Sequence, residues 1–159
     1  MKMAIGIGDT APDFSLPCTD GSTFVLSEEV KKGPVLLNFY VGDFGINCTN
    51  YMTKFCERIQ EMDDLGVRTV GINDNSMDSH TGFRKAIGLR WELLFDKDKE
   101  VAKAYGAIVG PGHMVTGFTN REFILVDGEM KVRFVWRSSV PKELPVFDDI
   151  LDGVKSAIQ

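Results

Sequence analysis

The sequence of 159 residues predicts an α/β fold in which helices flank a mixed central sheet. A continuous apolar run at residues 35–41 is typical of a central strand that is covered on both faces. Strand-like and helix-like segments alternate after it, and two later β-rich runs form a hairpin around Asp127-Gly128, a strong turn signal. Because a chain of this length usually forms one domain, we expect residues 1–159 to fold as a single unit.

The individual elements follow from the spacing of the apolar residues. An amino-terminal β-hairpin is expected over residues 11–29, packed on the core that follows it. The strands of the sheet are expected at residues 35–41, 67–73 and 91–96 and in the hairpin at 121–136. The helices are expected from about Cys48 to Leu65 and at residues 76–89, 98–106 and 143–158, with a glycine-rich loop at 107–120.

Capping residues support these helix boundaries. Gly66 suits the end of the first helix, and Ser76 and Asp98 suit the starts of the next two. Pro145 is tolerable only in a first helical turn, where its missing N–H would have no acceptor, so we expect it in the first turn of the last helix.

Composition and charge exclude several classes of protein. The net charge of −5 argues against a dedicated nucleic-acid binder, which would normally carry a basic face. No apolar run approaches the roughly 18 residues of a membrane span. The first residues form no signal-like apolar run, since Asp9 and Asp13 interrupt them, so we expect a cytoplasmic location. Three scattered cysteines and two histidines show no zinc spacing, so we expect no metal or other cofactor.

Cys48 is the candidate reactive group, because it follows a glycine-containing loop at the predicted start of a helix. Unpaired backbone N–H groups and the positive end of the helix dipole favour a thiolate in the first helical turn. The local pattern leaves a second interpretation open, in which Cys48 is a small packed residue, since free cysteines are often buried.

The segment "FYVGDFGINCTNYMTKF", residues 39–55, resembles the active-site segment of the peroxiredoxins, the thiol peroxidases with a thioredoxin-like fold. The matching positions are Phe39, Tyr40, Phe44, Cys48 and Thr49. Further segments match in order along the chain, among them "GDTAPDFSLPCTDGSTFVLSE" and "LLFDKDKEVAKAYG". The likeness is strongest to members of the bacterioferritin-comigratory-protein type, and it implies a thioredoxin-like fold.

The resemblance implies a role for each residue of the site. Cys48 would be the peroxidatic cysteine, whose thiolate attacks the O–O bond and becomes sulfenic acid. Arg121 stands six residues before Asp127, as an arginine does in the family, and would stabilise the thiolate and orient hydrogen peroxide or an organic hydroperoxide. Gly45, Asn47 and Tyr40 are the candidate substrate-binding residues. The alternative for Arg121 is a position on the solvent face of an edge strand.

Three departures from the family pattern bear on activity. Val41 replaces the usual proline, Gly45 replaces a Thr or Ser, and Tyr51 replaces a common Glu. Gly45 has no hydroxyl to hold the peroxide, and losing one positioned donor of this kind costs on the order of 10²–10³ in rate. A water, Asn47 or backbone N–H groups are possible substitutes, and Gly45 could adopt positive φ. A weak peroxidase, or a relative that serves as a redox sensor or interaction module, is therefore the alternative to an antioxidant enzyme.

The residue that resolves the sulfenic acid is open. Cys56 lies eight residues after Cys48, about 12 Å along a continuous helix, whereas a disulfide needs Cα atoms within about 7 Å. We expect Cys56 to be packed in the core. Cys18 lies in the predicted hairpin turn, where we expect it to be exposed and available within the subunit or to a partner. If neither resolves, an external thiol such as a thioredoxin-like protein reduces Cys48.

The remaining expectations concern the histidines and assembly. His80 is expected at the surface or at a helix cap, and His113 lies in a loop that could approach a neighbouring subunit's site. By analogy with the family, a homodimer is possible.

Overall fold

The structure, a computed structural model, describes residues 4–159. Its main sheet has the strand order β5-β4-β3-β6-β7. Strands β3, β4 and β5 are parallel to one another, β6 pairs antiparallel with β3, and β7 pairs antiparallel with β6. The strands are β3 (Val35–Phe39), β4 (Arg68–Asn73), β5 (Glu92–Phe95), β6 (Glu122–Val126) and β7 (Val132–Arg137). The predicted mixed sheet is confirmed, and so is the hairpin of β6 and β7.

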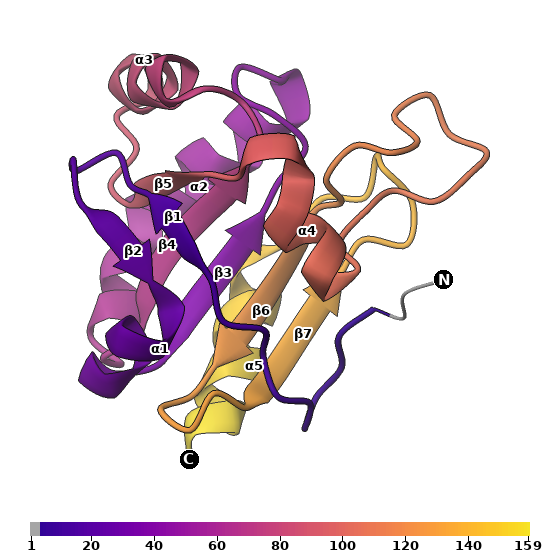
Figure 1. Cartoon of the computed structure of the whole chain (residues 1–159). Coiled ribbons are helices and arrows are strands. Elements are labelled where there is room, and N and C mark those ends of the chain that lie inside the picture. The colour runs from indigo at the N-terminus through magenta and orange to yellow at the C-terminus, as the bar shows by residue number, and fades with distance from the viewer. Residues whose placement is uncertain (1–3) are drawn as a thin grey trace.

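The predicted amino-terminal β-hairpin is confirmed as β1 (Ser15–Pro17) and β2 (Thr23–Val25). It lies in front of the main sheet in Figure 1, and an isolated bridge between Cys18 and Leu94 joins it to β5. The other elements are helices, two of them short 3-10 turns. They are α1 (Leu26–Glu29), η1 (Val30–Lys32), α2 (Ile46–Asp63), α3 (Met77–Ile87), η2 (Lys97–Lys99), α4 (Glu100–Tyr105) and α5 (Phe147–Ile158).

Two apolar cores cover the two faces of the sheet. Residues of α2, α3 and α5 pack against one face, where α2 and α5 lie behind the strands in Figure 1. The hairpin, α1 and α4 pack against the other face. All five residues of β3 are buried, because this central strand is covered on both sides. The apolar run that predicted it therefore reflects burial on both faces.

Some predicted boundaries are wrong. The strand expected at 35–41 ends at Phe39, and the last helix begins at Phe147 rather than 143, so Pro145 precedes it. Asp98 does not cap α4, since its own φ is 57°. Asp96 does so instead, with its carboxylate accepting from the N–H groups of Val101 at 2.9 Å and Ala102 at 3.0 Å. Ser76 caps α3 as predicted, with Oγ accepting from Ser79 N–H at 3.1 Å.

Candidate active site

Cys48 lies in the first turn of α2, as the sequence predicts. Gly45 is the N-cap of this helix, and no side chain caps it. The first bond that returns to the cap is Thr49 N–H to Gly45 O at 2.8 Å, so the N–H of Cys48 has no intrahelical acceptor. The possible positive φ of Gly45 is not found, since its φ is −65°. Phe44 takes that conformation instead, with a φ of 63°, and this reverses the chain before the helix.

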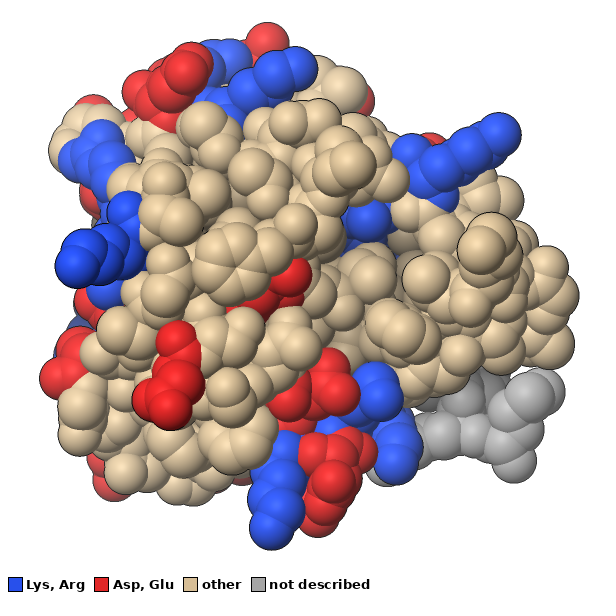
Figure 2. Space-filling model, turned by 90° about the horizontal axis from the view of Figure 1, so that it is seen from above, with Lys and Arg blue, Asp and Glu red and all other residues tan. Residues whose placement is uncertain are grey.

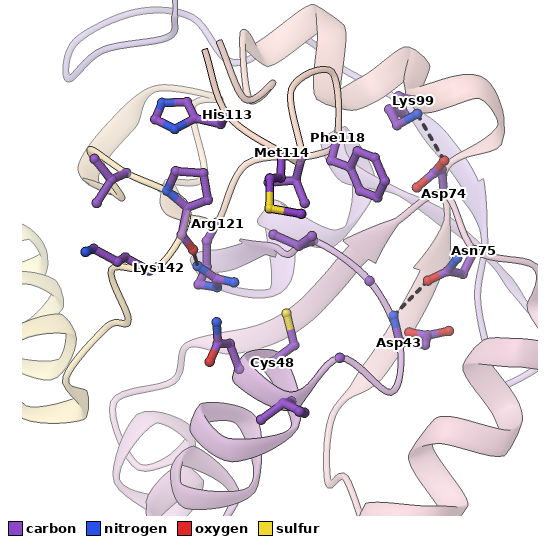
Figure 3. A pocket seen from close by; sticks show the side chains of 18 residues that line it. Asp43, Cys48, Asp74, Asn75, Lys99, His113, Met114, Phe118, Arg121 and Lys142 are labelled. Carbon is purple, nitrogen blue, oxygen red and sulfur yellow. Dashed lines mark hydrogen bonds and ion pairs between the residues drawn. The ribbon is translucent and has the colours of Figure 1, made fainter. Parts of the chain in front are cut away.

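A pocket of about 920 Å³ lies above the start of α2. It is formed by the loop that follows β3, the first turn of α2, the loop at 113–118 and the segment at 140–142, together with Arg121. Asp74 and Asn75, which follow β4, and Lys99, which precedes α4, complete its lining. Figure 3 shows the Cys48 sulfur pointing into this space. Cys48 is only 2% exposed, so the pocket is its route to solvent and to a small substrate.

Arg121 lines the same pocket, and the solvent-face alternative is wrong because the residue is 3% exposed. It immediately precedes β6, and Figure 3 shows its side chain across the pocket from Cys48. Its Nη1 donates to the carbonyl oxygens of Pro141 and, at 3.2 Å, Glu143. Its Nε has no hydrogen-bond partner within residues 4–159. A buried guanidinium held by neutral carbonyls retains charge and donors for an anion in the pocket.

A buried polar cluster holds the loop that leads to Cys48. His80 Nδ1 and Ser79 Oγ each lie 2.7 Å from Asp43 Oδ2, and Tyr40 OH donates to Oδ1 at 2.6 Å. His80 Nε2 lies 3.1 Å from Leu94 O. Burial acts to raise the pKa of Asp43, but the hydrogen bonds from His80 and Tyr40 outweigh it and lower that pKa. The cluster ties the loop to α3.

The surface position expected for His80 is therefore wrong, since its side chain is fully buried. The sequence offered no signal for this, because Asp43 is 37 residues away and the pair meets only through the fold. Asn75 adds a further contact that sequence reasoning missed, with its Oδ1 accepting from Asp43 N–H at 2.7 Å.

The candidate substrate-binding residues are only partly brought together. Gly45 and Asn47 line the pocket with Cys48. Tyr40 is not among the lining residues, because it is fully buried and its hydroxyl is bonded to Asp43. His113 lines the pocket of its own chain. The sequence did not indicate that Met114 and Phe118 would line the same pocket as Cys48, because the glycine-rich loop has no periodicity that reveals its path.

The other two cysteines lie away from the pocket. Cys18 is 4% exposed, so the expected exposure is wrong, and it belongs to the core on the opposite face of the sheet from Cys48. Cys56 is packed in the core, as expected, with its sulfur accepting from Arg90 N–H at 3.4 Å. Burial raises the pKa of both thiols. Helix α2 is continuous between Cys48 and Cys56.

The mouth of the pocket is apolar and open. Ile46 is 79% exposed, Phe118 is 47% exposed and Met114 is fully exposed, and all three line the pocket. Seen from above, uncharged atoms cover most of the surface, and basic and acidic side chains are interspersed around them (Figure 2). This apolar mouth suits the alkyl group of an organic molecule better than it suits a highly charged molecule.

Fold and site together define a class: a thioredoxin-like protein with a thiol at a helix start and an arginine facing it. The model of the AhpC/TSA family matches residues 7–135. A relative assigned as peroxiredoxin bcp in Coxiella burnetii is 32% identical over 137 residues, which is 84% of this chain and 89% of that protein. The chain belongs to the AhpC/TSA family, the peroxiredoxins, and its function is that of a thiol peroxidase.

Solved structures agree with this assignment. A peroxidoxin, BcpB, from Mycobacterium tuberculosis has a TM-score of 0.80 at 26% identity, over 94% of this chain and 96% of that one. A cysteine-to-serine variant of PrxQ from Xylella fastidiosa has a TM-score of 0.87 at 18% identity, over 99% and 100%, and shows the shared fold. No helix in residues 4–159 is long and apolar enough to cross a bilayer.

Proposed function

We propose that Cys48 is the peroxidatic residue and that Arg121 is its catalytic partner. The observation that carries this proposal is the shared pocket, in which the Cys48 sulfur faces a buried guanidinium that lacks a carboxylate partner among the described residues. Helix N-terminal N–H groups and Arg121 together favour the thiolate, which is the nucleophile.

The reaction begins when the Cys48 thiolate attacks the terminal oxygen of a hydroperoxide. An S–O bond forms as the O–O bond breaks, and the leaving oxygen takes a proton to become an alcohol, or water when the substrate is hydrogen peroxide. The cysteine loses two electrons and becomes sulfenic acid, while the peroxide gains two. Arg121 donates to the oxygens as negative charge moves onto the leaving one. Backbone N–H groups at the start of α2 are further donors, but they do not replace the hydroxyl that Gly45 lacks.

The sulfenic acid is returned to thiol by an external reductant. A first thiol displaces water from the sulfenic sulfur to form a mixed disulfide, and a second thiol releases Cys48 and leaves with the disulfide. A thioredoxin-like protein is the proposed donor, because Cys18 and Cys56 are buried away from the pocket. This need for a reduced thiol supply supports a cytoplasmic location. Hydrogen peroxide and organic hydroperoxides are the proposed substrates, and the apolar mouth accommodates the latter.

Trapping of the sulfenic acid tests the assignment of Cys48. The reduced protein is treated with one equivalent of peroxide in the presence of dimedone, and the adduct is located by peptide mass spectrometry. We expect the adduct on Cys48 and its loss in Cys48→Ser, with Cys56→Ser on the same helix as the matched control. An adduct on Cys18 or Cys56, with Cys48 unmodified, contradicts the proposal.

A further inference from the structure

Arg121 is a buried cation without an ionised partner in the part of the chain that the structure describes. Its guanidinium contacts carbonyl oxygens of Pro141 and Glu143, and no ion pair joins it to any carboxylate in residues 4–159. Its Cζ lies over the ring of Tyr51, 5.9 Å from the centroid. An aromatic face attracts a guanidinium without neutralising its charge, as a carboxylate would.

The Tyr51 ring is fixed by contacts on its other sides. Asn38 Nδ2 donates to its hydroxyl at 3.2 Å, and Phe55 and Phe123 pack edge-on, with centroids at 5.6 and 6.4 Å. This contact also explains why a polar residue interrupts the apolar strand β3: Asn38 orients the ring. Burial raises the pKa of Tyr51 well above its ordinary value, so its hydroxyl stays neutral.

We propose that Tyr51 is a positioning residue for the reaction at Cys48, because its ring holds Arg121 in place while leaving the guanidinium charge to the thiolate and the peroxide. The inference deepens the proposed function, on which it rests. The contact also compensates in part for the hydroxyl that is missing at Gly45. A guanidinium whose charge is not shared with a carboxylate attracts the thiolate more strongly.

The test is the pH dependence of Cys48 alkylation by iodoacetamide in the full chain, followed by peptide mass spectrometry. Tyr51→Glu places a carboxylate beside Arg121, and we expect the midpoint of the pH profile to rise by about one unit or more. Tyr51→Phe keeps the ring and removes only the hydroxyl, so its midpoint should stay within a few tenths of that of the unmodified protein. A midpoint in Tyr51→Glu equal to that in Tyr51→Phe overturns the proposal.

A second comparison separates pairing with Arg121 from direct repulsion of the thiolate. In an Arg121→Gln background, Tyr51→Glu should raise the midpoint clearly less than it does when Arg121 is present, and an equal rise in both backgrounds refutes the role of the contact. If Tyr51→Glu does not fold, Tyr51→Leu removes the ring without adding charge, and we expect a roughly 3- to 10-fold slower reaction with peroxide. An unchanged rate in Tyr51→Leu refutes the role of the ring.

Alkylation needs no peroxide, so these midpoints do not depend on the proposed catalytic role of Cys48. If dimedone trapping fails while the midpoints shift as expected, the catalytic assignment fails and the Tyr51 contact stands. If trapping succeeds and the midpoints do not shift, the catalytic assignment of Cys48 stands and the role of the Tyr51 contact fails.

Discussion

Replacing Gly45 with threonine should restore a missing hydrogen-bond donor to the peroxide pocket. Gly45 has φ −65° and ψ 141°, a conformation that any residue adopts, and a Cβ built there meets nothing closer than Gly42 O at 3.6 Å. Threonine is also a good N-cap, and it differs from glycine at this position by only a few tenths of a kcal/mol. The substitution Gly45→Thr should therefore fold normally.

The expected gain follows from the worth of one positioned donor. Removing such a donor from a preorganised site typically costs on the order of 10²–10³ in rate, or about 2.7–4 kcal/mol. Because the Gly45 position lines the pocket with Cys48, a hydroxyl there can reach the peroxide without other changes. We expect Gly45→Thr to raise the second-order rate constant with hydrogen peroxide by about 10²-fold.

The assay is stopped-flow reaction of the reduced protein with excess peroxide. Gly45→Ala is the matched control, since it adds the Cβ without the hydroxyl, and its rate constant should stay within about threefold of the starting protein. A gain of less than threefold in Gly45→Thr, with the fold intact by circular dichroism, would refute the reasoning. It would mean that backbone N–H groups or a water already supply the missing donor.

Two further predictions concern the loop and the cysteines. Asp43→Ala leaves the buried donors of His80 and Tyr40 unpaired, so the free energy of unfolding by urea should fall by about 3–5 kcal/mol. The control is Asp78→Ala on the exposed side of α3, which should change this free energy by less than about 1 kcal/mol. Because the pKa of Asp43 is lowered in the folded state, its contribution to the free energy of unfolding is complete above about pH 4 and is lost as the pH falls. If Asp43→Ala lowers the free energy of unfolding as much at pH 3 as at pH 7, this reasoning is contradicted. Cys18→Ser and Cys56→Ser should each turn over peroxide with dithiothreitol within about twofold of the rate of the unmodified protein. A Cys48–Cys56 disulfide in the oxidised native protein would contradict this, because it would require α2 to unwind.

Local patterns predicted most of the fold. The apolar run of β3, the turn at Asp127-Gly128 and the spacing of α2 each report a local property, burial or chain reversal, that neighbouring residues encode. The wrong boundaries lie where tertiary contacts decide. Asp96 rather than Asp98 caps α4 because the chain turns just before this helix, at Asp98 and Lys99, which both have positive φ, and no periodicity encodes that turn.

Most of the candidate site was predictable only through the family resemblance, although the place of Cys48 at a predicted helix start had already pointed to that residue. Cys48 and Arg121 line one pocket, and the family pattern pointed to both. The Asp43–His80 cluster and the Arg121–Tyr51 contact were missed because their partners come from different elements of the fold. Tyr51 was visible in the sequence only as a departure from the usual Glu, and its partner Asn38 only as an interruption of a strand.

The central claim is that Cys48 reacts with peroxide as an activated thiolate. The most direct measurement is the second-order rate constant of the reduced protein with hydrogen peroxide at pH 7, by stopped flow, compared with Cys48→Ser and with free cysteine. We predict a constant at least about 10²-fold above that of free cysteine, which Cys48→Ser abolishes, since the site supplies helix N–H groups and a buried guanidinium. A constant equal to that of free cysteine, or one that survives in Cys48→Ser, would contradict the account.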